Sequence, residues 1–196
     1  MNALYLCEIA EGLPLPDFGH ALAQHLMEKK HHAVRVASFS AWNLLAEALR
    51  QHGILTLPTV RFTERGKPFF ESHPLHFSLA HSGQLAAVLL SDAPCGVDIE
   101  RVRPDVAQKL LDRCLSPREK ECGSMDFFTF WTRKECIGKY SGQGVSAHPA
   151  QIDTLAPEYA GLHFFTETIF DGALCEYRIS ALSETPLSEP IQKIAF

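Results

Sequence analysis

Gly96-Val97-Asp98-Ile99-Glu100 opens the second half of the chain and reads as a short β-strand. Because side chains alternate along a strand, Val97 and Ile99 share one face while Asp98 and Glu100 share the other. The two carboxylates then start roughly 6–7 Å apart at the backbone, so they can share a hard divalent cation such as Mg²⁺. The other interpretation is an amphipathic edge strand with solvated acids, and the pentapeptide alone favours that one.

A helix is predicted downstream, over residues 125–140. At about 100° per residue, its buried stripe is expected to consist of Phe127, Phe130, Trp131 and Ile137. Glu135 and Lys139 lie one turn apart on another face. The ordinary interpretation is an exposed ion pair worth ~0.3–0.5 kcal/mol. The sharper one adds a third carboxylate to the first two, with a lysine directed at phosphate oxygens. The helix by itself leaves both open.

Two short segments of the first half are candidates for contact with an anion. His81 and Ser82 are expected in a tight hairpin turn, where an imidazole, a hydroxyl and a backbone N–H can together receive a phosphate. Gly66-Lys67-Pro68 is expected to hold a lysine over an anion. The ordinary alternatives are a solvated histidine and a common turn sequence, so neither segment is specific alone.

Hydrophobic periodicity and turn residues predict the other elements. Strands are expected at residues 3–9, 75–79, 85–90, 96–100, 162–170 and 173–182. Helices are expected at residues 17–29, 40–52, 105–115 and 125–140, and Ser116-Pro117-Arg118-Glu119 has the pattern of a capping box. Residues 53–58 and 144–149 share a Gly-apolar-x-x-x-Pro pattern after a helix. This weak repeat implies two similar α+β subdomains with a site at their junction.

Composition excludes several classes of protein. The chain has 196 residues, 46% of them hydrophobic, and a formal net charge of −5. It can form one large domain or two small ones, and its acidity argues against a nucleic-acid binder. No apolar run approaches the ~20 residues of a membrane-spanning helix, and the N-terminus has no signal-peptide pattern. The six cysteines include no C-x-x-C pair, which predicts free thiols and no zinc framework. We expect a cytoplasmic protein that contacts neither nucleic acid nor membrane.

The order and spacing of the segments at residues 66–68, 77–83, 96–100 and 131–139 resemble the phosphopantetheinyl transferases, specifically the surfactin-synthetase-activating type. The combination of a D-x-E strand with a W-x-x-K-E-x-x-x-K helix is specific, and the matched stretch spans about Val60 to Gly144. The resemblance implies an α+β fold, a pseudo-dimer of two similar subdomains, each a small mostly antiparallel sheet packed with helices. We place the subdomains at residues 1–94 and 95–196 and expect a monomer.

The resemblance also implies an activity, 4′-phosphopantetheinyl transfer. The phosphopantetheine arm of coenzyme A would pass to a serine of an apo acyl or peptidyl carrier protein, releasing 3′,5′-ADP. Matched residue by residue, Asp98, Glu100 and Glu135 would bind Mg²⁺, or Mn²⁺ in its place. Glu135 would also act as general base on the serine, and Lys139 would contact the diphosphate.

The nucleotide end of coenzyme A would be held by Lys67 and His81, with Ser82 beside His81. The sequence departs from the family pattern here, since the residue before His81 is commonly serine and is Ala80 in this chain. An arginine that family members often carry near position 41 is also missing. Arg35 or the basic cluster at residues 29–32 would have to take its place.

Two other functions stay open at this point. One is a Mg²⁺-dependent phosphodiesterase or nuclease that uses the same acids with water as nucleophile, although it leaves the Lys67 and His81 segments unexplained. The other is a non-catalytic carrier-binding scaffold with a degenerate site. The presence of all three acids and Lys139 argues against the scaffold.

Overall fold

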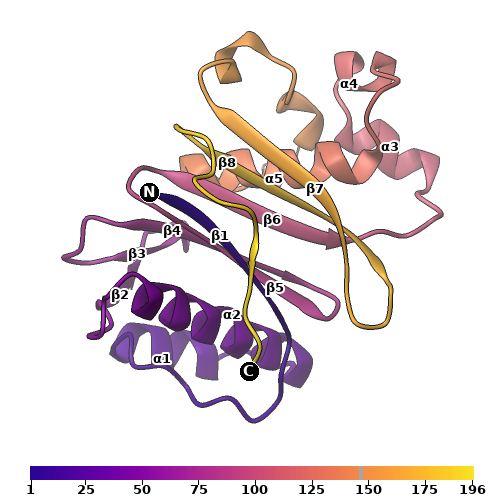
Figure 1. The fold of residues 1–196 in the computed structure, drawn as a ribbon. Helices are drawn as coiled ribbons and strands as arrows, with labels where there is room; N and C mark the ends of the chain where they lie inside the picture. Colours follow the sequence, from indigo (N-terminus) through magenta and orange to yellow (C-terminus); the bar gives the residue numbers. More distant parts are fainter. Residues whose placement is uncertain (146–147) are drawn as a thin grey trace.

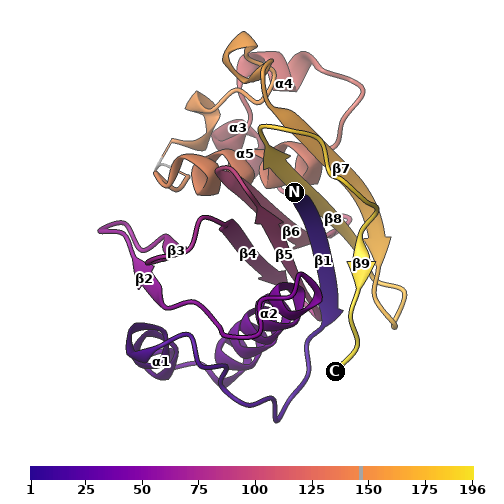
Figure 2. The same ribbon diagram turned by 60° about the vertical axis from the view of Figure 1, so that its left-hand side comes forward.

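The computed structural model describes residues 1–145 and 148–196 and has a mixed α+β fold of small sheets packed with helices (Figure 1). The strands are β1 (Asn2–Glu8), β2 (Val60–Phe62), β3 (Pro68–Phe70), β4 (His76–Ser82), β5 (Leu85–Ser91), β6 (Cys95–Arg101), β7 (His163–Phe170), β8 (Glu176–Ser183) and β9 (Gln192–Lys193). The helices are α1 (His20–Met27), α2 (His32–Gln51), α3 (Gln108–Cys114), α4 (Pro117–Glu121) and α5 (Phe127–Ser141), with short 3₁₀ helices η1 (Pro149–Gln151) and η2 (Pro157–Tyr159). Helices α1 and α2 lie at one end of the molecule and α3, α4 and α5 at the other, with the large sheets between them (Figure 2).

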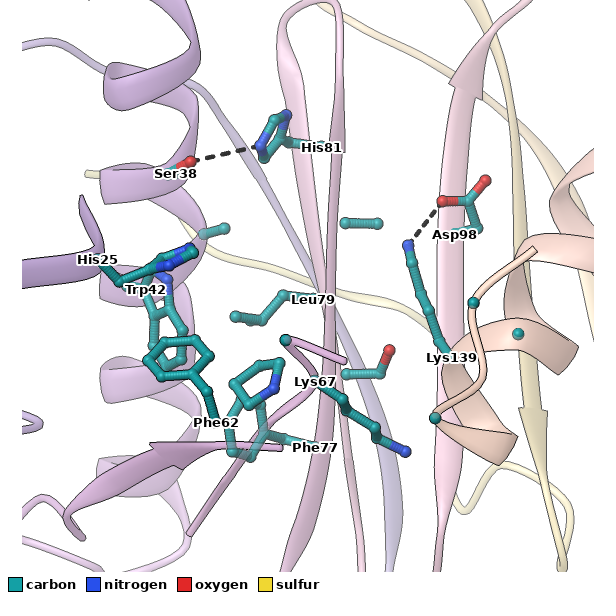
Figure 3. A pocket seen from close by; sticks show the side chains of 18 of the residues that line it. His25, Ser38, Trp42, Phe62, Lys67, Phe77, Leu79, His81, Asp98 and Lys139 are labelled. Atoms are coloured by element: carbon teal, nitrogen blue, oxygen red, sulfur yellow. Dashed lines mark hydrogen bonds and ion pairs between the residues drawn. The ribbon is translucent and has the colours of Figure 1, made fainter. Parts of the chain in front are cut away.

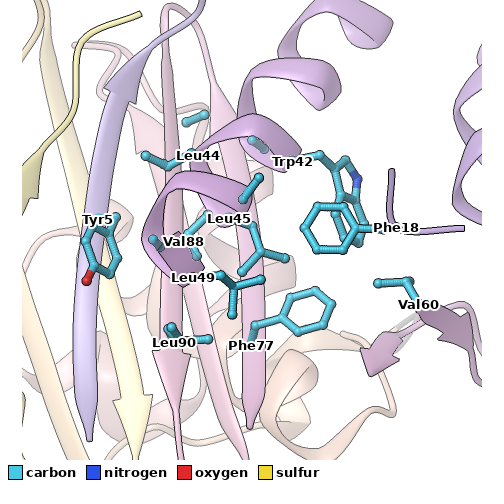
Figure 4. Close-up of a cluster of buried hydrophobic side chains, with 14 of the residues drawn as sticks. Tyr5, Phe18, Trp42, Leu44, Leu45, Leu49, Val60, Phe77, Val88 and Leu90 are labelled. Atoms are coloured by element: carbon cyan, nitrogen blue, oxygen red, sulfur yellow. The ribbon is translucent and has the colours of Figure 1, made fainter. Parts of the chain in front are cut away.

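The first sheet has the strand order β4-β5-β1-β9 and is antiparallel except for the β1–β9 pair. Helix α2 covers one face of it, because apolar residues recur at helical spacing and are fully buried, namely Leu44, Leu45, Ala48 and Leu49. They pack with Val88 and Leu90 of β5 in the cluster that Figure 4 shows. The helix ends before Gly53, whose φ of 78° lies in the left-handed region that favours glycine.

The second large sheet has the strand order β6-β8-β7 and is antiparallel throughout. Helix α5 lies on β6 and β8, and the Asp126 carboxylate caps its start by accepting from the Thr129 N–H at 3.0 Å. A Cβ at Gly96 of β6 would lie 2.1 Å from the carbonyl oxygen of Cys136. Because glycine has no Cβ, the backbone of α5 can lie directly against β6.

Strand β4 lies beside β6, and serine side chains make the connection between the two sheets. The Val97 N–H donates to Ser78 Oγ at 3.0 Å, and the Arg101 N–H donates to Ser82 Oγ at 3.1 Å. An apolar cluster drawn from both sheets fills the space behind this contact and includes Leu4, Leu89 and Ile179. The two halves therefore share buried surface, which holds the site residues of β4 next to those of β6.

Two predicted boundaries near this contact are wrong. Helix α2 begins at His32 and not near Ser40, because the burial pattern of the helix continues through Ala37 and Ser38. His81 and Ser82 lie in strand β4 and not in a turn. His81 pairs with Ala86, and the turn falls one residue later, at Gly83, where φ is 56°. Strand β4 thus continues three residues beyond the predicted end at residue 79, through Ala80, His81 and Ser82, all paired with β5.

The predicted buried stripe of α5 is half right. Phe130 and Ile137 are buried, but Phe127 and Trp131 are only partly buried and stack on one another at 6.3 Å between ring centroids. The side of the helix that meets the sheet carries Phe128, Thr132 and Cys136 instead. The reason is that the sheet is polar beneath α5, where Thr132 Oγ1 lies 2.7 Å from Ser180 Oγ.

The remaining predictions concern smaller features. Helices α1 and α3 are shorter than predicted, and the hairpin between β7 and β8 and the capping box at Ser116 are confirmed. All six cysteines carry free thiols. Ser146 and Ala147, which belong to the predicted repeat at 144–149, lie outside the described residues. Among the helices of the described ranges, none has the length and apolar content needed to cross a membrane.

Candidate active site

A cavity of about 440 Å³ lies between the two ends of the molecule (Figure 3). Helix α2, the β2–β3 hairpin and β4 line it from the first half of the chain, and β6 and α5 line it from the second. Four of the residues predicted to form a site are in its lining, namely Lys67, His81, Asp98 and Lys139. The fold thus brings four segments that are separate in sequence to one cavity.

Asp98 and Lys139 form an ion pair in the lining of this cavity. Lys139 Nζ donates to Asp98 Oδ1 at 2.7 Å and to the carbonyl oxygen of Val97 at 2.8 Å. Asp98 Oδ2 is buried and, within the described part of the chain, has no hydrogen-bond partner. Burial raises the pKa of Asp98 to about 7; Lys139 acts in the opposite direction, whereas Glu135 and Glu100 raise the pKa further. An oxygen in this position can accept a donor or bind a cation.

Glu100 and Glu135 lie close enough to Asp98 to interact with it electrostatically. Glu100 Oε2 accepts a hydrogen bond from the Ser82 hydroxyl at 3.0 Å. Burial raises the pKa of Glu135, with Lys139 opposing and Glu100 adding to the shift. Across residues 1–145 and 148–196, no three histidine, cysteine or acidic side chains converge into a ready metal-binding group. The three acids therefore form one electrostatic cluster, in which Asp98 binds Lys139 and Glu100 binds Ser82.

His81 lies at another end of the cavity, where basic and hydroxyl groups meet. Its Nε2 is 3.5 Å from the Ser38 hydroxyl of α2 (Figure 3). Burial lowers the pKa of His81, and the charges of Lys29 and Lys139 lower it further. Lys29, from the basic cluster at residues 29–32, also lines the cavity. This region therefore contains several hydrogen-bond donors, charged and neutral, that can contact an anion.

The loop between β2 and β3 reaches from the first half of the chain to the end of α5. Lys67 Nζ donates to the carbonyl oxygen of Tyr140 at 3.1 Å, and Arg65 Nη1 donates to that of Gln143 at 3.4 Å. Both cations meet carbonyl groups at a helix C-terminus, where positive charge is favoured. Burial lowers the pKa of Lys67. The loop therefore connects the two sides of the cavity.

Several lining residues were not predicted from the sequence. Ser38 contacts His81, while His25 and Phe62 pair their rings at 4.6 Å between centroids, next to Trp42 in the lining. Helical spacing placed none of them in a site, because Trp42 also belongs to the apolar core and His25 lies on a different helix. Ser38 lies on the same helical stripe as Ala41 and Trp42, which was the one available signal, but the late predicted start of α2 left Ser38 outside that helix.

The family model and the similar proteins all indicate the same family. Residues 94–181 match the family described as the 4'-phosphopantetheinyl transferase superfamily. The chain is 34% identical over 147 residues to the 4'-phosphopantetheinyl transferase AcpT of Salmonella typhi, covering 69% of this chain and 74% of that protein. It is 38% identical over 111 residues to AcpT of Escherichia coli (strain K12), covering 50% of this chain and 56% of that protein. Similarity to the 4'-phosphopantetheinyl transferase Sfp of Bacillus subtilis (strain 168) is 30% over 97 residues, 44% of this chain and 43% of that one.

The chain is therefore a member of the 4'-phosphopantetheinyl transferase family, as the order of its motifs predicted. The family match begins one residue before β6 and ends within β8. It thus includes Asp98, Glu100, Glu135 and Lys139. The chain spans a little over half the length of the Escherichia coli relative that it matches.

Proposed function

We propose that this protein transfers the 4′-phosphopantetheine arm of coenzyme A to a serine of an apo acyl or peptidyl carrier protein and releases 3′,5′-ADP. The observation that carries the proposal is the environment of Asp98, which lines the cavity of a chain of this family. Its Oδ1 accepts a hydrogen bond from Lys139, and its buried Oδ2 has no partner within the described residues. The printed names of the relatives describe the same transferase class.

Asp98, Glu100 and Glu135 are the proposed ligands of Mg²⁺, with Mn²⁺ as a substitute. Hard oxygen donors suit both ions, and the unpartnered Asp98 Oδ2 supports the fit. A bound divalent ion would neutralise the diphosphate of coenzyme A. Lys139, held beside Asp98, is placed to contribute a second positive charge to the same diphosphate.

Glu135 is the proposed general base. Its raised pKa suits a carboxylate that must accept a proton near neutral pH. In the reaction, the carrier serine oxygen forms a bond to the phosphorus next to pantetheine, and the bond from that phosphorus to the bridging oxygen breaks. The electron pair leaves with 3′,5′-ADP, and the serine proton passes to Glu135 directly or through water.

The nucleotide end of coenzyme A is proposed to bind in the part of the cavity formed by the first half of the chain. His81, Lys67 and Lys29 supply positive or protonatable groups there, and Ser38 supplies a hydroxyl. Of the candidates for the missing arginine near position 41, Lys29 is favoured because it lines the cavity, whereas Arg35 donates to the Lys29 carbonyl oxygen. Ser82 acts on the site through Glu100, to which it donates.

The two subdomains, residues 1–94 and 95–196, are proposed to be related as a pseudo-dimer. In support, each begins with a strand, continues through helices and ends in a hairpin whose second strand pairs antiparallel with the first strand of the unit. One chain supplies both walls of the cavity, which supports the proposed monomer.

The test is intact mass spectrometry of an apo carrier protein incubated with this protein, coenzyme A and Mg²⁺. We expect a mass gain of one phosphopantetheine that EDTA abolishes and that Asp98→Asn reduces. Release of 3′,5′-ADP without a carrier would instead support the phosphodiesterase. Binding of coenzyme A and carrier without any mass gain would support the scaffold, and either result would overturn the transferase.

A further inference from the structure

A fully buried ion pair joins α5 to α4, and the proposed reaction does not use it. Lys134 Nζ lies 2.6 Å from Glu119 Oε2, and both side chains are 0% exposed. Lys134 directly precedes Glu135, the proposed general base, in the sequence of α5. The ion pair is therefore adjacent in sequence to the proposed general base but lies on a different face of the helix.

Glu119 is the centre of a hydrogen-bond network that joins three segments. Its carboxylate accepts from the Ser116 N–H at 2.8 Å, which completes the capping box of α4. It also accepts from the N–H and the hydroxyl of Thr154, each at 2.9 Å. Lys134 donates in addition to the carbonyl oxygen of Ile152. The pair thus fastens α5 to the start of α4 and to the segment that follows η1.

Stability does not by itself account for such a pair. Removing two charges from water costs about as much as their attraction returns, so a neutral apolar replacement is often as stable. What an ion pair with this many hydrogen bonds does provide is a fixed geometry. Here it fixes one point on the circumference of α5.

A second point on the circumference is fixed by Lys139, which binds Asp98 at 2.7 Å. At about 100° per residue, Lys134 and Lys139 lie about 140° apart around the helix axis, and Glu135 lies between them. Two anchors on different faces prevent α5 from rotating about its axis. The direction in which Glu135 projects toward Asp98 and Glu100 depends on that rotation.

We propose that Glu119 and Lys134 are positioning residues, which set the rotation of α5 and thereby hold Glu135 beside Asp98 and Glu100. The assignment of these acids to metal binding and catalysis rests on the proposed function. Residues that orient the ligands of a metal typically affect metal affinity or activity by about 10–100-fold when they are replaced. A misplacement of about 1 Å in a catalytic group has an effect of similar size on rate.

The test compares the double variant Glu119→Gln/Lys134→Met with the wild type. Both replacements are neutral and close in volume to the originals, so no unpaired charge stays buried. The readouts are the thermal midpoint, the dissociation constant of Mn²⁺ by electron paramagnetic resonance in the absence of coenzyme A, and kcat and KM for coenzyme A. Lys120→Met is the matched control, because Lys120 lies on α4 like Glu119 but forms an exposed ion pair, with Asp112 of α3.

We expect the double variant to fold, to bind Mn²⁺ roughly tenfold more weakly and to lose kcat by a similar factor. KM for coenzyme A should stay within about twofold, because the nucleotide contacts lie on the other half of the chain, and Lys120→Met should match the wild type. A purely structural pair predicts a changed thermal midpoint with unchanged Mn²⁺ affinity. A folded double variant with wild-type Mn²⁺ affinity and kcat overturns the proposal.

Glu119→Asp decides the question if the double variant does not fold. It keeps the charge but shortens the reach of the carboxylate, so weaker Mn²⁺ binding supports positioning and unchanged binding overturns it. Failure of the proposed function has a different signature, since it shows in the wild type as an absence of Mn²⁺ binding or carrier modification. Failure of the positioning role shows only in the variants.

Discussion

Helices α2 and α5 each cover a sheet, in which β1 lies beside β5 and β6 lies beside β8. The layers beneath the two helices nevertheless have opposite chemistry. The fourth residue of β1 is Tyr5, which pairs with Val88 in a cluster of leucines and aromatic rings (Figure 4). The fourth residue of β6 is Asp98, which pairs with Ser180 and binds Lys139. The first layer is apolar throughout its centre, and the second contains charges and hydroxyls.

The difference separates the source of stability from the source of chemistry. Apolar burial beneath α2 contributes free energy of folding in proportion to the area removed from water. The acids beneath α5 cost free energy to bury, and the raised pKa of Asp98, about 7, records that cost. A protein with both layers can tolerate the second because the first stabilises the shared fold. The following variants test whether the two roles are separable.

Glu135→Gln should have the largest effect. Without a proton acceptor the variant is expected to lose roughly 10²–10⁴-fold in kcat for carrier modification, with a thermal midpoint close to that of the wild type. Glu47→Gln, the same change on α2, is the control and should retain wild-type turnover. A Glu135→Gln rate near that of the wild type would remove Glu135 from the role of general base.

Leu45→Ala tests the apolar layer. Leu45 is fully buried, so the cavity left by truncation is expected to lower the free energy of unfolding by about 2–5 kcal/mol. Turnover per folded molecule should not change. Cys136→Ala, at the equally buried polar layer, should cost about 1 kcal/mol. Urea titration measures both, and equal losses at the two positions would contradict the separation of roles.

Gly96→Ala tests the spacing that the polar layer requires. Its Cβ would meet the Cys136 carbonyl oxygen at 2.1 Å, so α5 must move away from β6. We expect a loss of about 1–3 kcal/mol in unfolding free energy together with weaker Mn²⁺ binding. Ala3, the second residue of β1, has the corresponding place beneath α2, and Ala3→Gly should cost only about 0.5–1 kcal/mol. A Gly96→Ala variant that binds Mn²⁺ like the wild type would show that the close approach is dispensable.

The residues of the polar layer could be predicted from the sequence, but the packing of α5 against its sheet could not. Strand alternation put Asp98 and Glu100 on one face, and helical spacing put Glu135 one turn from Lys139, because both periods are properties of the backbone. Packing decided the rest. Phe127 and Trp131 were expected in the core by hydrophobicity, but the sheet beneath α5 is polar and its helix presents Thr132 and Cys136 to it.

The cavity lining of the first half was harder to predict. His81 was expected in a turn, since the apolar run ends before it, and only the register with β5 extends the strand to Ser82. Ser38 and Lys29 approach His81 through tertiary contacts between α2, the segment before it and β4, which no local pattern records. Family resemblance supplied His81 and Lys67, and the structure adds their neighbours.

His81→Asn should have the smallest effect and bears on the binding role of the first half. Burial and the charges of Lys29 and Lys139 lower the pKa of His81, so the free protein has a neutral imidazole at about pH 8. A bound phosphate favours the protonated form, so affinity for coenzyme A should rise as pH falls toward about 6, with uptake of a proton. Calorimetric titrations at the two pH values should show that His81→Asn weakens binding by about tenfold at the lower pH and less at the higher. Because His81 is proposed to bind the nucleotide end of coenzyme A and not the reacting phosphorus, kcat should stay unchanged. A fall in kcat with unaltered affinity would instead assign His81 to the reaction.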